Sequence, residues 1–443
     1  MMIMPRKVFI SFLGTTNYHA CTYKIDDTSL TEKPVRFVQE ALIRYFCMGE
    51  KAWTEEDRVL IFCTHHSDIN HRDGSYELNW LDNGHGDKAK TDLEKVGLQT
   101  ILGTLRNEGL KPSVEMVQIE SGFTEEQVWS IFNTVYSKLY EADKIYFDVT
   151  HAFRSIPIFS IVLFNHSKVL KNTTLEAIKY GAFEAPDAQG RVPVLDLTNI
   201  ARLQTYNRLA SDFKLFGKVG NIRQELGKDT GYVEDQAIRR LKEGVRLLDE
   251  YITTIQLSNL RKGEFVSSIK ENIDRVKTRN DVPQPFKNIL MELKDSMGEF
   301  NNGDSNVKAA INWACKYGMW IQAYALTEEY VISKVRGHEE VSREIPRQLP
   351  ETKKRQFISS ILALENEIIK GGGAEGQLTR FREEAKRISN MDIVKELRPY
   401  YRPLAATRNA LAHGSGEIQY RQLQRNLIDY CNGCFKVLNN YSL

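Results

Sequence analysis

The segment that decides the fold runs from Lys144 to Ser155 and reads KIYFDVTHAFRS. Residues 144–147 are mostly apolar or aromatic and predict a short buried strand. Small and polar residues follow, and a helical pattern then extends from Pro157 to Val169. A buried strand that passes through a polar turn into a helix is the repeating unit of a parallel α/β sheet.

The same alternation extends from residue 7 to residue 197. Further strands are expected at 8–13, 58–62, 114–117, 175–180 and 192–195, and further helices at 37–45, 91–108 and 124–139. Thr124 and Gln127 form a capping-box pattern at the start of the last of these helices. Residues 1–200 are therefore predicted to form an α/β domain with a parallel, Rossmann-like sheet that carries helices on both faces.

The strand pattern ends near Asn199, and the rest of the chain is predicted to be all helical. Turn-forming residues at 301–305 and 371–373 interrupt the helices. We predict an all-α connector over residues 201–305 and an all-α terminal domain over residues 306–443.

Composition places the chain among ordinary globular proteins. It has 443 residues, 42% apolar and 27% charged, with a net charge of +2, which by itself indicates neither nucleic acid nor membrane as a partner. No signal peptide and no apolar run of bilayer length is recognised. The six cysteines are scattered, as is usual in a reducing compartment, so a cytoplasmic location is expected.

Four predicted strand ends carry small polar residues, and parallel strands end at one edge of the sheet, where ligands bind. The candidate binding residues are Ser11, Gly14, Thr15, Thr16, Thr64, Asp148, Thr150, His151 and Arg154. Hydroxyls, turn amides and one arginine suit a polyanion. Neither a Walker loop nor a dinucleotide fingerprint is present, and His65, His66 and His151 match no metal spacing. The alternative is local: Thr150 and Ser155 cap the next helix, and Arg154 pairs with Asp148.

A second motif, RNALAH, occupies residues 408–413 and precedes Gly414, a common helix terminator. On a helix Asn409 and His413 share a face, whereas Arg408 and His413 diverge by roughly 140°. Histidine transfers protons near neutral pH and arginine binds phosphate, so the motif suits RNA cleavage without a metal. The alternative is a helix end at which His413 only interacts with the carbonyl dipole.

Basic and aromatic residues flank this motif and could bind RNA. They are Arg398, Arg402, Arg421 and Arg425, interleaved with Tyr400, Tyr401 and Tyr420. A solvated helix face with buried tyrosine rings is the alternative for any one of them.

Both motifs resemble those of one known family. Residues 148–154, DVTHAFR, resemble the Asp-x-Thr-His-Gly-Phe-Arg signature of CRISPR-associated CARF domains, and residues 11–15 resemble the first-strand loop of these domains. Residues 408–413 are similar to the HEPN ribonuclease pattern, and Trp313 with residues 322–329 is similar to an early HEPN helix. Ala152 departs from the usual glycine, and its methyl group could hinder close approach of a ligand.

The resemblance implies a ribonuclease effector of type III CRISPR systems. Its CARF half would bind a cyclic oligoadenylate, with cyclic tetra-adenylate as the first candidate, through the strand-end residues. Its HEPN half would cut single-stranded RNA without a metal or other cofactor, with Arg408, Asn409 and His413 as catalytic residues. A twofold ring calls for a homodimer. Alternatives are a sensor without nuclease activity, a ring nuclease that degrades its own activator, and a DNA-binding regulator.

Overall fold

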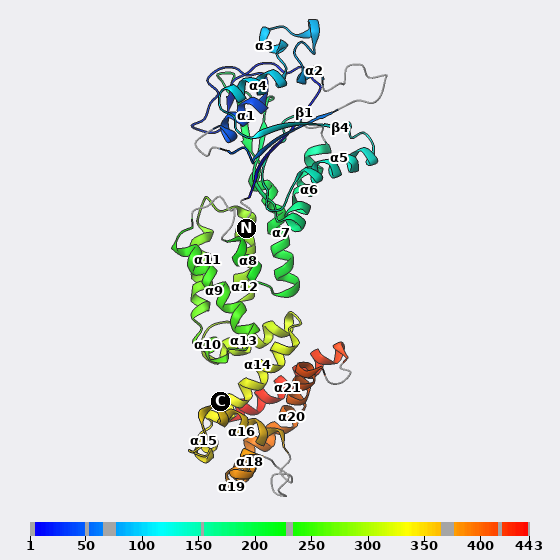
Figure 1. Ribbon diagram of the computed structural model, residues 1–443. Coiled ribbons are helices and arrows are strands. Elements are labelled where there is room, and N and C mark those ends of the chain that lie inside the picture. The colour runs from blue at the N-terminus through cyan, green and yellow to red at the C-terminus, as the bar shows by residue number, and fades with distance from the viewer. Residues whose placement is uncertain are drawn as a thin grey trace. The chain divides into compact units, whose positions relative to one another are not determined.

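The computed structural model describes residues 5–48, 53–64, 77–151, 155–226, 234–364, 376–414 and 419–441. The chain divides into two compact units, Met1–Thr205 and Tyr206–Leu443 (Figure 1). The first is an α/β unit and the second is helical, so the predicted fold class is confirmed.

The first unit contains a seven-stranded sheet in the order β2-β7-β6-β5-β1-β3-β4. The strands are β1 Lys7–Leu13, β2 Tyr23–Lys24, β3 Arg58–Thr64, β4 Ser113–Ile119, β5 Lys144–Asp148, β6 Thr174–Gly181 and β7 Val192–Asp196. All neighbouring strands run parallel except β6 and β7, which are antiparallel. The prediction of a parallel sheet is thus correct except for the β6–β7 pair, and β2 was not foreseen.

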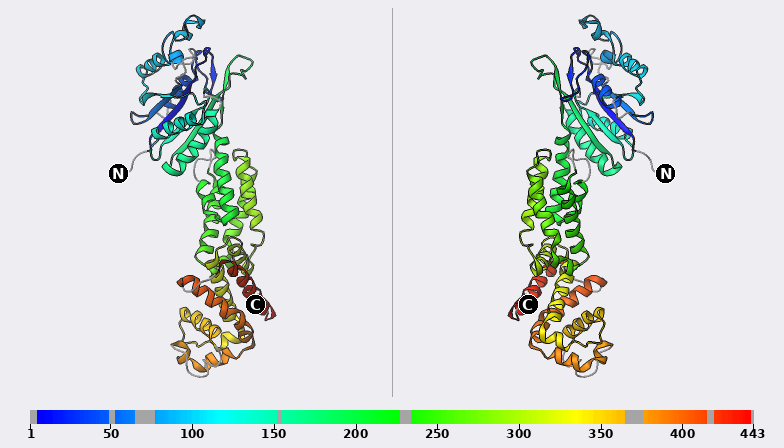
Figure 2. Two further views of the ribbon diagram at one scale, coloured as in Figure 1. Left: turned by 90° about the vertical axis from the view of Figure 1, so that its right-hand side faces the viewer. Right: turned by 90° about the vertical axis from the view of Figure 1, so that its left-hand side faces the viewer.

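Helices cover both faces of this sheet (Figures 1 and 2). Helices α1 (Val38–Cys47) and α4 (Leu98–Asn107) pack with Phe9 and Ile61 on one face. Helices α5 (Glu125–Lys138) and α6 (Ser155–Lys171) pack with Ile10 and Phe62 on the other. Successive residues of β1 and β3 therefore point into two different cores, which explains why both strands are apolar over most of their length, with Ser11 as the polar residue inside β1.

The prediction of one helix over residues 91–108 is wrong. The segment forms α3 (Asp92–Lys95) and α4, separated at Gly97. A Cβ atom at Gly97 would lie 2.4 Å from the carbonyl oxygen of Trp80, so the chain passes too close to its neighbour for any other residue. The remaining short helices of this unit are α2 Glu77–Trp80 and the 3₁₀ turn η1 Gly86–Lys88.

The second unit follows α7 (Thr198–Phe216), which begins in the first unit. Its further helices are α8 Gly220–Glu225, α9 Gln236–Thr253, α10 Leu257–Lys262, α11 Glu264–Lys277, α12 Gln284–Ser296, α13 Gly303–Lys316, α14 Trp320–Gly337, α15 Glu339–Glu344, α16 Glu351–Ala363, α18 Gln377–Arg380, α19 Arg382–Ser389, α20 Asp392–His413 and α21 Tyr420–Asn440. One cluster of buried side chains extends from Tyr206 to Leu438. The division between residues 305 and 306 stays a prediction.

Two predicted turns have different outcomes. The turn at 301–305 leads into α13, where Asn302 and Ser305 form a capping box. Residues 371–373 lie outside the described residues. Within the described ranges, no helix has both the length and the apolar character needed to cross a membrane.

Candidate functional sites

The sheet brings most of the predicted binding residues to one edge. The central strands lie in the order β5-β1-β3, and their register places Ser11 beside Asp148 and Leu13 beside Cys63. Three segments therefore meet at this edge: the turn after β1 with Gly14, the end of β3 with Thr64, and the turn after β5 with Thr150. Arg154 lies outside the described residues, so its predicted roles stay predictions.

Asp148 organises this edge from inside the protein. Its buried carboxylate accepts hydrogen bonds from the Ser11 hydroxyl at 2.7 Å, the Thr150 hydroxyl at 2.6 Å and the Thr150 amide at 3.0 Å. Burial raises the pKa of Asp148, and these three donors oppose that shift. Ser11 and Asp148 are both fully buried. Their side chains therefore fix the shape of the turns, while Thr16 in the first turn is exposed to solvent.

Thr150 links two strand ends. Its hydroxyl oxygen accepts a hydrogen bond from the Gly181 amide at 2.8 Å while it donates to Asp148. The turn after β5 is thereby tied to the end of β6 as well as to β1.

His151 is held in an aromatic stack. Its ring lies 3.8 Å from the ring of Tyr18, nearly parallel at 23°, and 5.6 Å from the ring of Phe183. Burial lowers the pKa of His151 to about 3, so the imidazole is neutral at physiological pH. Its Nε2 atom has no hydrogen-bond partner among the described residues. Because this Nε2 atom is itself buried, a base or hydroxyl could form a directed hydrogen bond with it only after the side chains around it move.

Gly14 is required by this stack. A Cβ atom at this position would lie 2.6 Å from the Tyr18 hydroxyl oxygen and 3.1 Å from the His151 carbonyl oxygen. The close approach of the two turns explains the glycine in the first-strand loop, where no positive φ angle demands it.

Asn79 and Arg36 hold the first turn, and neither role could be recognised from the sequence pattern. The Asn79 side-chain amide donates to the carbonyl oxygens of Gly14 and Thr16, each at 2.8 Å. The Arg36 guanidinium donates to Asn79 Oδ1 at 2.9 Å. Both side chains are buried, and they come from segments far from residues 14–16 in sequence. The amides of the turn are thereby held in place before any ligand arrives.

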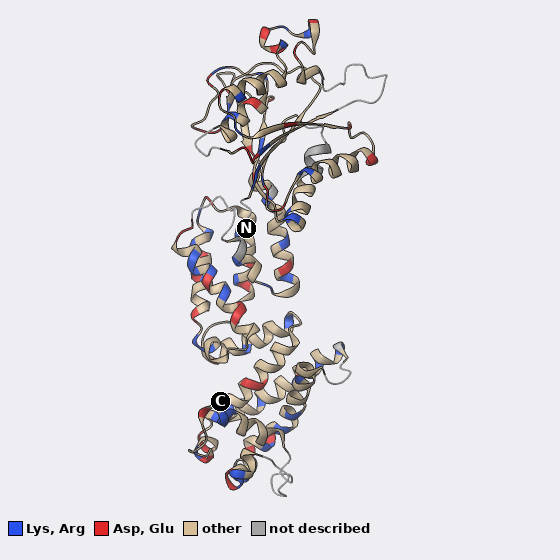
Figure 3. Ribbon diagram, viewed as in Figure 1, with Lys and Arg blue, Asp and Glu red and all other residues tan. Residues whose placement is uncertain are grey.

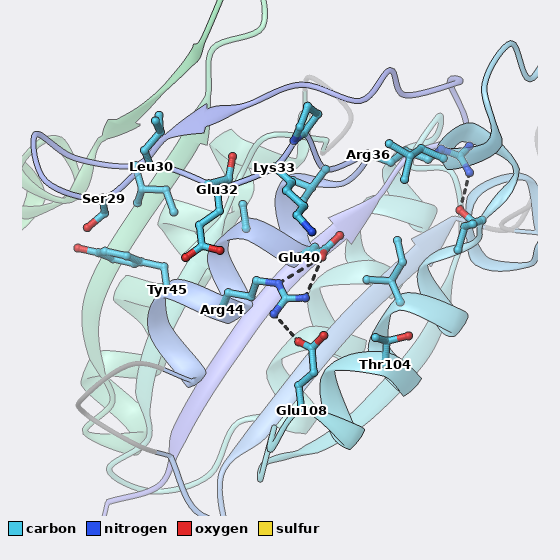
Figure 4. A pocket seen from close by; sticks show the side chains of 18 residues that line it. Ser29, Leu30, Glu32, Lys33, Arg36, Glu40, Arg44, Tyr45, Thr104 and Glu108 are labelled. Atoms are coloured by element: carbon cyan, nitrogen blue, oxygen red, sulfur yellow. Dashed lines mark hydrogen bonds and ion pairs between the residues drawn. The ribbon is translucent and has the colours of Figure 1, made fainter.

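A separate cavity of about 670 Å³ lies beside α1 and α4 (Figure 4). Arg44 crosses its wall and forms ion pairs with Glu40 and Glu108. Burial raises the pKa of Glu40, which Arg44 opposes. None of the predicted binding residues lines this cavity.

In the second unit, the predicted catalytic motif lies at the end of α20. The helix ends with His413, and Gly414 follows in the left-handed conformation at φ 64°. The prediction that Gly414 terminates the helix is therefore confirmed. Asn409 and His413 are exposed, whereas Arg408 is half-buried. The three side chains of one chain therefore do not converge on a single point.

Arg408 is fixed by a buried carboxylate. Its Nε atom donates to Glu328 Oε2 at 2.5 Å and its Nη2 atom to Glu328 Oε1 at 3.0 Å. The Glu328 side chain, from α14, is 2% exposed and that of Arg408 is 25% exposed. This bidentate pair, more than any other contact, raises the pKa of Arg408. The guanidinium is thus permanently charged and held in one orientation, with part of its surface still open.

Three further side chains complete this network. The Tyr401 hydroxyl lies 3.3 Å from Glu328 Oε1 and 3.0 Å from Ser359 Oγ, and Arg355 approaches Glu328 Oε1 at 3.7 Å. Tyr401 is fully buried, so the buried-ring alternative holds for this residue. Glu328 lies within the 322–329 run that resembles an early HEPN helix, but the sequence assigned it no role.

No protein-family model matches the chain. Over 197 residues it is 24% identical to the CRISPR-associated protein MJ1674 of Methanocaldococcus jannaschii, a match that covers 41% of this chain and 30% of that protein. The chain therefore spans less than a third of this relative's length. The resemblance to CRISPR-associated proteins is thereby confirmed.

Among solved structures, Enterococcus italicus Csm6 bound to cyclic hexa-2′-fluoro-hexa-dAMP is similar over 98% of this chain and 94% of that chain, with 11% identity and a TM-score of 0.47.

Proposed function

We propose that this protein is a cyclic-oligoadenylate-activated endoribonuclease of type III CRISPR defence that cuts single-stranded RNA without a metal. The observation that carries the proposal is the Arg408–Glu328 pair. It presents an oriented guanidinium on the same helix as an exposed histidine. An arginine held in advance can stabilise charge that develops on a phosphate in the transition state.

The reaction follows from these side chains. A histidine accepts the proton of the RNA 2′-hydroxyl, whose oxygen attacks the adjacent phosphorus as the bond to the 5′ oxygen breaks. The products are a 2′,3′-cyclic phosphate and a 5′-hydroxyl, and the leaving oxygen takes up a proton. Arg408 stabilises the phosphate, and Asn409 orients the histidine or the phosphate. The reaction needs one group that accepts a proton and one that donates it.

A homodimer supplies the missing group. One chain offers one His413, at roughly 140° from Arg408 around the helix. Two copies related by a twofold axis would contribute a pair of histidines and a pair of arginines to one phosphate. The same symmetry would match a cyclic oligoadenylate at the strand-end edge of two first units.

The strand-end edge suits such a ring chemically. The amides of the turn at Gly14 and Thr15 and the exposed Thr16 hydroxyl can bind phosphate oxygens. The stack of Tyr18, His151 and Phe183 contains a buried imidazole nitrogen that has no partner among the described residues, and it would suit an adenine if a ligand opens the stack. Cyclic tetra-adenylate and cyclic hexa-adenylate are both candidates.

Cleavage of a fluorescent single-stranded RNA in EDTA, with and without each cyclic oligoadenylate, tests the proposal. We expect activation in the wild type, none in His413→Ala, and full activity in His338→Gln, which changes the other histidine of the second unit. Cleavage that survives in His413→Ala would overturn the catalytic assignment. Binding of the ring without RNA cleavage would favour a pure sensor, and loss of the intact ring on chromatography would reveal a ring nuclease.

A further inference from the structure

An open groove of about 690 Å³ runs along α20 and reaches the candidate catalytic motif. The α20 groove, as we call it, is lined chiefly by Lys395, Arg398, Pro399, Arg402, Pro403 and Asn409. Asn409 stands at the end nearest His413. Among the described residues that line the groove none is acidic. Positive charge therefore gathers along α20, where Lys and Arg are coloured blue in Figure 3.

The three basic side chains play different parts. Lys395 is exposed, and its Nζ atom lies 3.5 Å from Asp392 Oδ1 in the first turn of α20. Arg398 is 9% exposed and donates to the Ile361 carbonyl oxygen at 3.0 Å and to Ser389 Oγ at 2.5 Å, so it forms the fixed floor of the groove. Burial, and next the charge of Arg402, lower the pKa of Arg398. An anion in the groove would relieve this repulsion. Arg402 is exposed and can reach such an anion.

Two prolines give the groove hydrogen-bond acceptors as well. Pro399 and Pro403 lie inside α20 and have no N–H group. The helical hydrogen bonds to the carbonyl oxygens of Lys395 and Pro399 therefore cannot form. Residues four apart share a helix face, so both carbonyls lie on the face that lines the groove. A groove with cations and backbone acceptors side by side suits a ligand that carries both anions and hydroxyl donors.

We infer that the α20 groove holds the sugar-phosphate backbone of single-stranded RNA next to the cleaved bond. Lys395 and Arg402 bind phosphates, and the carbonyl oxygens of Lys395 and Pro399 accept hydrogen bonds from 2′-hydroxyls, which DNA lacks. The distance along the helix from residue 395 to residue 409 is about 21 Å, enough for a short stretch of extended strand. This inference rests on the proposed function and adds to it the path of the substrate and a reason for preferring RNA over DNA.

Binding to full-length His413→Ala, with saturating cyclic oligoadenylate, tests the phosphate contacts. The probe is a fluorescein-labelled oligoribonucleotide, which this variant should bind without cutting. Lys395→Gln/Arg402→Gln should raise Kd about tenfold and reduce the salt slope of log K by about 1.4, since each single-strand phosphate contact contributes about 0.7. Arg275→Gln/Lys277→Gln on α11 removes the same charge from two exposed positions and should change neither value. Equal effects of the two double variants would overturn the inference.

The 2′-hydroxyl contacts have their own test. Pro399→Ala/Pro403→Ala restores two N–H donors without changing charge, and alanine favours the helix, so the unit should remain folded. The ratio of Kd for a DNA oligonucleotide to Kd for the same RNA sequence should fall toward one. An unchanged ratio would refute the carbonyl contacts. A wild type that binds RNA through the groove but cuts none would refute the proposed function and the position of a cleaved bond, and only the RNA-binding part of this inference would stand.

Discussion

Replacing Glu328 by alanine should destabilise the second unit strongly, because it leaves the Arg408 guanidinium without its carboxylate. Removing one partner of a buried ion pair costs about 3–5 kcal/mol. The Arg408 side chain is 25% exposed and can regain some water, which places the expected cost near the lower limit, at about 3 kcal/mol. The adjacent Glu329 is 29% exposed and pairs with Arg355 near the surface, so Glu329→Ala should cost less than about 1 kcal/mol.

Urea unfolding of the full chain, followed by far-ultraviolet circular dichroism, measures both costs. Hydrogen exchange in α14 and α20 assigns the loss to this unit. In a double-mutant cycle with Arg408→Ala, each single variant leaves one charge unpaired. The sum of the two single-variant costs should therefore exceed the cost of the double variant by about 2 kcal/mol. Single costs that add within about 0.5 kcal/mol would refute the coupling, as would equal costs for Glu328→Ala and Glu329→Ala.

The same pair has a kinetic consequence if the protein cleaves RNA. Glu328→Gln keeps the shape of the side chain but loses its charge and one of its two acceptor oxygens. Arg408 should then sample several orientations, and kcat should fall by roughly 10- to 100-fold with a smaller change in KM. A change in KM alone would mean that Arg408 contributes only to binding.

Three further predictions concern single side chains. Gly14→Ala should weaken the binding of cyclic tetra-adenylate measured by calorimetry, because the new Cβ atom would lie 2.6 Å from the Tyr18 hydroxyl oxygen. The control Gly103→Ala in α4, where the Cβ atom would point into open space, should leave this affinity unchanged. Ser11→Ala removes a hydrogen bond to Asp148, whose pKa burial raises above its ordinary value. Its cost in urea unfolding should be about 1–3 kcal/mol while the carboxylate is ionised, and it should shrink as the pH falls and the carboxyl gains a proton. A pH-independent cost would contradict this. Tyr401→Phe should cost about 1 kcal/mol in the same assay, since its hydroxyl contacts Glu328 and Ser359, and no loss would mean that water replaces both contacts.

The central strands were predictable because each is a mostly apolar run that faces two cores. Val8 and Ile10 contact one core and Phe9 the other, so Ser11 is the one polar residue between Val8 and Leu13 of β1. The direction of β7 was not predictable, since a strand has the same side-chain period in either direction. The break at Gly97 was missed for a different reason. It depends on the approach of Trp80, a contact between segments that the local helical pattern does not contain.

The candidate sites likewise contain residues that could be predicted from the sequence and residues that could not. Residues such as Ser11, Asp148 and Thr150 were found because they follow strands whose ends must meet. The supporting residues Asn79 and Arg36 come from outside those turns, and Glu328 lies 80 positions before its partner Arg408. A carboxylate in the middle of a helical run looks like a solvent-exposed residue, and only the packing of α14 against α20 shows that it is buried.

The different surroundings of Arg408 and His413 suggest how a ligand could control the proposed nuclease. Arg408 is oriented by Glu328 of its own chain. His413 and Asn409 are exposed and diverge from Arg408, so a single chain leaves the set of catalytic groups incomplete. In the proposed homodimer, an activator would therefore have little effect by moving Arg408 and a large effect by changing the contacts of His413 with the corresponding helix end of the second copy. If the protein is activated as proposed, we therefore expect a ligand at the strand ends to adjust how the second units of two copies face each other, a rigid-body change of the kind that subunit interfaces permit.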